Sequence, residues 1–308
     1  MKTNTSVADH AALQMVDTPT SKEKRMSTYT RFTVTRYSPS LWRVTFDNPP
    51  INLIDAVMMK ELLHLLTEIE RDKRLGVVLF DSADPDFFLA HYDIAGDPAE
   101  LEGVETTAGR HPFTDLHIRL SKSPAVTISA IRGRARGAGS EFALATDIRF
   151  ASRERAVLGQ FEIGVGAAPG GGALNRLSSL VGRARAFEIL VSGQDFDGGL
   201  AERYGYVNRA IPDEQFVDFV DAFAQRVSRF DLLALADIKR FVNAATLPAD
   251  EPLGAEIDAF WKSAQRPAFP ALHNHAFKAG YSQRGPVELN LGDFVGTILA
   301  DPDSYSTR

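Results

Sequence analysis

The stretch GRARGAGSEFALATDIRF, residues 133–150, places three small residues, Gly137, Ala138 and Gly139, shortly before Glu141. Glycine loses more conformational freedom on folding than any other residue, so this run indicates that something must approach the backbone closely. The following EFALATD segment is typical of a helix, whose first N–H groups have no partner within the helix. Together with the helix dipole, such groups can hold a negative charge that develops on a carbonyl oxygen. Taken alone, the run is more simply explained as a tight turn with Glu141 in the first helical turn, where acids are favoured.

The bulk composition limits the class of protein. The chain has 308 residues, 44% hydrophobic and 24% charged, which is typical of a soluble globular protein with one large domain or two smaller ones. A formal net charge of -6 argues against a general electrostatic grip on nucleic acid. No apolar run reaches the roughly 18 residues that a membrane span needs. The absence of cysteine excludes disulfides, thiolate metal sites and a cysteine nucleophile, and it suits a cytoplasmic protein.

The pattern along the chain predicts an α/β protein. Residues 1–28 are polar, lack the apolar core of a signal peptide and carry acids, so we expect a disordered tail. The periodicity then predicts a helix over 56–71 and another near 113–122, and strands over 76–83, 125–131 and 147–152. The polar stretch 97–112 is expected to be a loop. Strands that alternate with helices predict an α/β core over 29–228 and a helical region over 229–308. We also expect this helical region to take part in oligomer formation.

Three further stretches carry polar groups in informative settings. In LGQFEIGVGAAPGGG, residues 158–172, Glu162 lies among apolar neighbours, and burial there would raise its carboxyl pKa. The glycines of this stretch fit neither of the common phosphate-binding motifs, although a glycine-rich helix start can hold phosphate. NPPINLID, residues 48–55, reads as a loop, and FFLAHYDI, residues 87–94, reads as a strand end. A lone histidine in such a place, here His91, is more often structural than catalytic.

Taken in order, the four stretches resemble the enoyl-CoA hydratase/isomerase (crotonase) superfamily. NPPINLID is similar to its N-x-P-x-N-A-L segment, and FFLAHYDI is similar to F-x-A-G-x-D-[IL]. The run over 125–152 resembles the family's glycine turn and following helix, and LGQFEIGVGAAPGGG resembles F-G-x-P-E-i-x-l-G-x-x-P-g-x-G. The likeness covers about Arg31 to Ala245. It implies a spiral of strand–strand–helix units with a helical C-terminal region, assembled as homotrimers or paired trimers.

The resemblance also implies a chemistry, which is stabilisation of a thioester enolate by two backbone N–H groups. By position, these donors would be Tyr92 N–H and Ala138 N–H. Hydratases of the family use two glutamates, so Glu141 would help activate water for attack at the β-carbon and Glu162 would deliver a proton to the α-carbon. Gly170 would help to hold the water or the carboxylate. Further substrate-binding positions implied by the resemblance are Asn52, Leu53, Ala90, Asp93, Gly137 and Pro169.

The resemblance implies hydration of a 2-enoyl-CoA to a 3-hydroxyacyl-CoA, with coenzyme A as part of the substrate and with no metal and no other cofactor. Both glutamates are present, which favours hydration over isomerisation. Other reactions stay open, namely isomerisation, C–C bond cleavage and thioester hydrolysis, because the LAHYD segment departs from the family pattern. A non-catalytic oligomeric binding protein also stays open, because Ala95 replaces a frequent basic residue and the C-terminal sequence is unlike the family's. Nucleic acid and membrane are not expected partners.

Three departures bear on the site. His91 stands where the family has a glycine before the first donor, and Phe161 replaces the usual proline before Glu162. Arg134 and Arg136 flank the glycine turn without a counterpart in the resemblance. They would either contact the phosphates of coenzyme A or remain solvated, and we favour solvation because exposure is the default for charged side chains.

Overall fold

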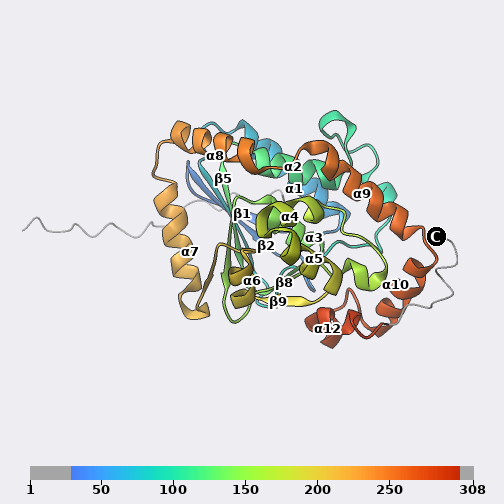
Figure 1. Ribbon diagram of the computed structural model, residues 1–308. Coiled ribbons are helices and arrows are strands. Elements are labelled where there is room, and N and C mark those ends of the chain that lie inside the picture. The colour runs from blue at the N-terminus through green and yellow to red at the C-terminus, as the bar shows by residue number, and fades with distance from the viewer. Residues whose placement is uncertain (1–28, 299–308) are drawn as a thin grey trace, which may run out of the picture.

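Two β-sheets organise residues 29–298, the part of the chain that the computed structural model describes (Figure 1). The tail expected over residues 1–28 lies outside the described residues. The larger sheet has the order β1-β2-β3-β5-β7-β10, with strands Phe32–Ser38, Leu41–Phe46, Val77–Ser82, Val126–Ile131, Ile148–Ser152 and Arg209–Ile211. The smaller sheet has the order β4-β6-β8-β9, with strands Phe87–Leu89, Arg134–Arg136, Val157–Gly159 and Asp195–Asp197.

Successive strand pairs divide between the two sheets, which makes the chain a spiral. Strands β3, β5 and β7 lie in the larger sheet, each followed by β4, β6 or β8 in the smaller one. After each pair comes a helix that returns the chain to the start of the next pair. The α/β fold class and the helical C-terminal region expected from the sequence are therefore confirmed.

Twelve α-helices pack around and between the sheets in residues 29–298. They are α1 (Ala56–Arg71), α2 (Pro112–Lys122), α3 (Ala138–Ala145), α4 (Ala173–Val181), α5 (Arg183–Ser192), α6 (Gly198–Tyr204), α7 (Asp213–Val227), α8 (Leu232–Thr246), α9 (Asp250–Ala264), α10 (Ala268–Ala279), α11 (Pro286–Leu289) and α12 (Leu291–Val295). The expected loop over 97–112 contains two short 3₁₀ turns, Pro98–Leu101 and Thr107–Gly109. Figure 1 shows α7 and α8 on one side of the molecule and α9, α10 and α12 on the other.

Helix α3 is fixed in place by its aromatic side chain. Phe142 is buried, and its ring packs edge-on against Phe46 at 5.5 Å and Phe80 at 5.1 Å between centroids. Aromatic pairs in this geometry add stabilisation beyond the apolar area that they bury. At the helix start, the Leu89 carbonyl lies where a Cβ atom on Gly139 would sit, so only glycine lets the helix begin against the end of β4. The sequence therefore sets α3 tightly between the two sheets.

The two arginines beside the glycine turn hold the chain at residues 288 and 289 to the smaller sheet. Arg136 is 1% exposed and pairs with Asp195 through two hydrogen bonds, while its Nη1 donates to the Glu288 carbonyl at 2.6 Å. Arg134 is half-buried and donates to the Leu289 carbonyl at 2.9 Å. The expectation of solvated guanidinium groups, or of phosphate contacts, is wrong for Arg136, because β6 carries it into the interior.

The helices also bear on a possible membrane location. Within residues 29–298, none of them is long and apolar enough to span a bilayer.

Candidate active site

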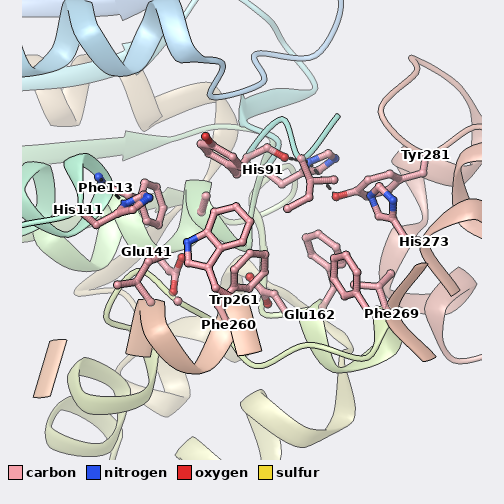
Figure 2. A pocket seen from close by; sticks show the side chains of 17 residues that line it. His91, His111, Phe113, Glu141, Glu162, Phe260, Trp261, Phe269, His273 and Tyr281 are labelled. Atoms are coloured by element: carbon pink, nitrogen blue, oxygen red, sulfur yellow. Dashed lines mark hydrogen bonds between the residues drawn. The ribbon is translucent and has the colours of Figure 1, made fainter. Parts of the chain in front are cut away.

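A cavity of about 70 Å³ lies between the start of α3 and the C-terminal helices (Figure 2). Five of the predicted catalytic and substrate-binding residues line it, namely Tyr92, Ala138, Glu141, Glu162 and Gly170, together with His91 and Phe161. They come from segments that are far apart in the chain and that belong to different strand–helix units. The fold therefore gathers both candidate oxyanion donors and both glutamates around one cavity.

The candidate donor at Tyr92 lies on a segment whose direction is fixed by pairing with residues 52–54. Ile54 N–H donates to the His91 carbonyl at 2.9 Å, and Asp93 N–H donates to the Ile54 carbonyl at 3.1 Å. The N–H and C=O of a trans peptide point in opposite directions, so Tyr92 N–H points away from Ile54. Within residues 29–298, this N–H has no hydrogen-bond partner. It is therefore free to receive a ligand oxygen.

The second candidate donor belongs to the first residue of α3. Gly137 caps the helix with φ of +47° and ψ of -123°, and the Ala138 N–H that follows has no partner in the described part of the chain. An unpartnered N–H at a helix start is a ready donor to an anion. A Cβ atom on Gly137 would lie 2.7 Å from the Glu162 carboxylate oxygen. The small residues of the turn therefore provide both a positive φ and space for a carboxylate.

Glu141 projects from the first turn of α3 and is held by the glycine-rich turn after residue 169. Its Oε1 accepts from Gly171 N–H at 2.6 Å and from Ala173 N–H at 3.4 Å. Burial, and then repulsion from Glu162, raise the pKa of Glu141 well above its usual value, although the two backbone hydrogen bonds oppose this shift. The donor that contacts the carboxylate is Gly171, next to the expected Gly170.

Glu162 follows β8 at the start of the 3₁₀ turn Glu162–Val165 and is buried. Its Oε2 has no hydrogen-bond partner among the described residues. Burial raises the pKa of Glu162 to about 7, although its own backbone N–H and His91 oppose the shift. Two neighbouring carboxyl groups with raised pKa values titrate as a unit, so the pair with Glu141 retains one proton near neutral pH. The site thus offers one proton donor and one acceptor together.

The other residues predicted to bind substrate do not line the cavity but support the backbone around it. The Asn52 side chain donates to the Phe87 carbonyl at 3.1 Å, and its own carbonyl accepts from Ala90 N–H at 3.2 Å. The side chain of Asp93 closes a turn by accepting from Ala95 N–H. Pro169 is buried, and Leu53 packs against the apolar group that includes Ala90. Gly137 is likewise absent from the cavity lining and, like these residues, holds the neighbouring backbone in place.

Sequence reasoning missed the roof of the cavity, which comes from residues beyond the resemblance noted over Arg31 to Ala245. It is mostly aromatic, and Figure 2 shows Phe260, Trp261 and Phe269 close to the two glutamates. The members from α9, α10 and the following turn are Ile257, Phe260, Trp261, Phe269, His273 and Tyr281. The clustering of aromatic residues in FWKSAQRPAF was the only local signal for this role.

The site shows no candidate metal centre. Among residues 29–298, histidine, aspartate and glutamate side chains form no group of three or more that would hold a metal ion.

Comparisons with known proteins agree with this geometry. The family model described as enoyl-CoA hydratase/isomerase matches residues 36–266. A short-chain-enoyl-CoA hydratase of Clostridium acetobutylicum is 30% identical over 222 residues, which cover 70% of this chain and 83% of that protein. A crystal structure from Streptomyces avermitilis, provisionally described as an enoyl-CoA hydratase, is 43% identical with a TM-score of 0.85. It covers 89% of this chain and 99% of its own.

A second crystal structure shares the fold at lower identity. The enoyl-CoA hydratase of Mycobacterium avium subsp. paratuberculosis is 24% identical with a TM-score of 0.72, over 81% of this chain and 100% of its own.

Proposed function

Because the chain belongs to the enoyl-CoA hydratase/isomerase family and is an enzyme of that type, we propose that it hydrates a 2-enoyl-CoA to a 3-hydroxyacyl-CoA. One observation carries the proposal, namely that one small cavity holds two buried glutamates and two backbone N–H groups that have no partner in the described part of the chain. Isomerisation requires proton transfer alone, for which Glu162 suffices. The presence of Glu141, held by Gly171 N–H, favours addition of water.

The proposed reaction assigns one role to each group. The thioester oxygen accepts hydrogen bonds from Tyr92 N–H and Ala138 N–H. Glu141 removes a proton from water as the water oxygen forms a bond to the β-carbon, and the electron pair of the C=C bond moves onto the thioester oxygen. Glu162 then delivers its proton to the α-carbon, and the thioester carbonyl re-forms. Donors placed before the charge develops need no rearrangement during the reaction.

The cavity favours a short acyl group. Its 70 Å³ is less than half of the roughly 150 Å³ that holds a benzene molecule in an engineered protein cavity. The aromatic roof formed by Phe260, Trp261 and Phe269 closes the space above the glutamates. The name of the Clostridium relative, a short-chain-enoyl-CoA hydratase, agrees with this size. We therefore propose a 2-enoyl-CoA with an acyl chain of about four carbons.

A panel of acyl-CoA substrates with mass-spectrometric detection tests the proposal. We expect a product heavier by one water from short 2-enoyl-CoA esters, together with loss of the enoyl-thioester absorbance. Isomerised, cleaved or hydrolysed products in place of the hydrated one would contradict the proposal. The proposed reaction uses coenzyme A only as part of the substrate and needs no other cofactor, because the acid, the base and the oxyanion donors all belong to the chain.

The pH dependence of hydration follows from the carboxylate pair. Because the pKa of Glu162 is raised to about 7 and that of Glu141 is also raised, the pair gains its second proton as the pH falls through about 7. The doubly protonated pair has no base, so we expect kcat/KM to fall about tenfold per pH unit below that point. Initial rates between about pH 5 and about pH 9 measure this. A constant kcat/KM across that interval would contradict the assignment.

We also propose a homotrimer or a pair of trimers as the working assembly. Support comes from large apolar side chains exposed on α5 and α8, namely Phe187, Val191, Leu233, Ile238, Phe241 and Val242. Exposed apolar groups of this kind are typical of subunit interfaces. Sedimentation velocity measures the assembly directly, and a monomer at micromolar concentration would contradict it.

A further inference from the structure

The histidine that precedes the Tyr92 donor faces a segment from the other end of the chain. We call residues 280–289 the C-terminal segment. His91 is buried, and its Nε2 lies 2.9 Å from Oε1 of Glu288, which is also buried and is 197 residues away. The imidazole stacks in parallel on Tyr281, with 4.4 Å between ring centroids (Figure 2). The two departures from the family pattern, His91 and the unlike C-terminal sequence, therefore contact each other.

The hydrogen bonds give the imidazole a defined orientation. An ionised carboxylate can only accept, so His91 Nε2 carries the hydrogen of the bond to Glu288. Burial alone would raise the pKa of Glu288, but His91 and the hydrogen bonds from His91 and Ser282 N–H outweigh burial and lower it. The Ser282 N–H donates to the same oxygen at 2.7 Å. The Glu288 carboxylate thus stays charged and holds the His91 imidazole through this hydrogen bond.

The oriented ring bears directly on the backbone of the donor. With the hydrogen on Nε2, His91 Nδ1 accepts from the Tyr281 hydroxyl at 3.1 Å, and the same nitrogen lies 3.0 Å from the Tyr92 carbonyl without donating to it. In the peptide that carries Tyr92 N–H, the His91 carbonyl accepts from Ile54 N–H. The peptide that carries Tyr92 N–H is therefore held in two ways. Its carbonyl, that of His91, accepts from Ile54 N–H, and the His91 side chain is fixed by Glu288 and Tyr281.

The C-terminal segment is itself anchored at several points. The buried Arg136 donates to the Glu288 carbonyl at 2.6 Å, and Arg134 donates to the Leu289 carbonyl. Arg284 forms ion pairs with Asp84 and Asp86, which precede β4. An anchored segment can hold Glu288, and through it His91, in one position.

We propose that Glu288 is a positioning residue for the oxyanion site, acting through His91 to hold Tyr92 N–H toward the thioester oxygen. The C-terminal segment thereby completes the site that the N-terminal part of the chain begins. The inference rests on the proposed enolate chemistry. A positioning role can be told from a purely structural ion pair. If Glu288 and His91 position the donor, their loss destabilises the transition state more than it weakens binding of the substrate.

Steady-state kinetics of three variants test the inference. We expect Glu288→Ala and His91→Ala each to lower kcat about a hundredfold with KM changed less than about twofold, because a displaced donor loses transition-state stabilisation. Glu288→Gln keeps an acceptor for Nε2 and should lose only about tenfold. The matched control is Glu202→Gln on α6, an exposed acid that should retain full activity.

A double-mutant cycle tests whether the two residues act through each other. The variant with both His91→Ala and Glu288→Ala should be no slower than the slower single variant, because residues that act as a unit are not additive. Multiplied losses in the double variant would overturn the proposal. So would full kcat in the single variants, whether or not their melting temperature falls.

A second measurement separates this inference from the proposed function. A 3-oxoacyl-CoA has an acidic α-carbon, and its bound enolate is visible by ultraviolet absorption even where no hydration takes place. The unaltered enzyme should raise the enolate fraction of this ligand, and Glu288→Gln should lower it while the ligand still binds. An equal enolate signal in both would overturn the inference alone. No enolate with the unaltered enzyme would overturn the proposed function and this inference with it.

Discussion

Replacing Glu162 with glutamine is expected to lower kcat for hydration about a thousandfold, within the range that general acid catalysis supplies. Glutamine has nearly the same shape, but its amide cannot deliver a proton to the α-carbon. Loss of enoyl-thioester absorbance measures the rate. In deuterated water, the variant should also lose incorporation of deuterium at the α-carbon. The matched control is Glu214→Gln on α7, which changes the same charge at an exposed position.

Stability measurements distinguish this loss of rate from damage to the fold. The pKa of Glu162 is raised to about 7 in the folded protein, above the value of 4.5 for an unperturbed glutamate. The unfolded chain therefore loses this proton as the pH rises past 4.5, whereas the folded protein keeps it until about pH 7, so stability falls between these values and the full penalty of an ionised Glu162 is present above pH 7. Glu162→Gln removes that penalty, so its melting temperature at pH 8 should equal or exceed that of the unaltered protein. A lower melting temperature together with the lost rate would favour a structural role.

The glycine-containing stretch over residues 133–150, which indicated the fold, also predicted much of the candidate active site. The glycines at 137 and 139 can be read directly from the sequence as a sign of close approach to the backbone. The structure shows what approaches, namely the Glu162 carboxylate at Gly137 and the Leu89 carbonyl at Gly139. Helical and strand periodicity were sufficient for α1, which spans the residues expected from the sequence. These features depend on short-range pattern and on an ordered series of motifs, which sequence displays directly.

What the sequence did not show depends on contacts between distant parts of the chain. Arg136 was expected to be solvated because nothing near it in the sequence indicates burial, yet its partners Asp195 and Glu288 lie far along the chain. The pairing of His91 with Glu288 is hidden for the same reason. The strand β6, three residues long, also shows no clear alternation in a run dominated by glycine and arginine. Tertiary contacts, rather than propensity, decide these features.

The oxyanion donor at Ala138 can be removed by proline, because the N–H in question belongs to the first residue of a helix. At this position the N–H has no partner within the helix, and the fixed φ of proline suits the helix start, so Ala138→Pro should fold. Deleting one such donor should lower kcat about 10²–10³-fold. The control Ala138→Gly keeps the N–H and should stay within about fivefold of the unaltered rate.

A second explanation for a slower Ala138→Pro variant is that the proline ring blocks the cavity. The binding of a saturated acyl-CoA separates this obstruction from the loss of the donor. A lost donor leaves ground-state binding nearly unchanged, because the interaction matters most once the charge has developed on the oxygen. We therefore expect Ala138→Pro to bind the saturated ligand within about threefold of the unaltered enzyme, and to bind the enolate of a 3-oxoacyl-CoA far more weakly. An equal loss for both ligands would show obstruction instead, and unchanged turnover would place the oxyanion elsewhere.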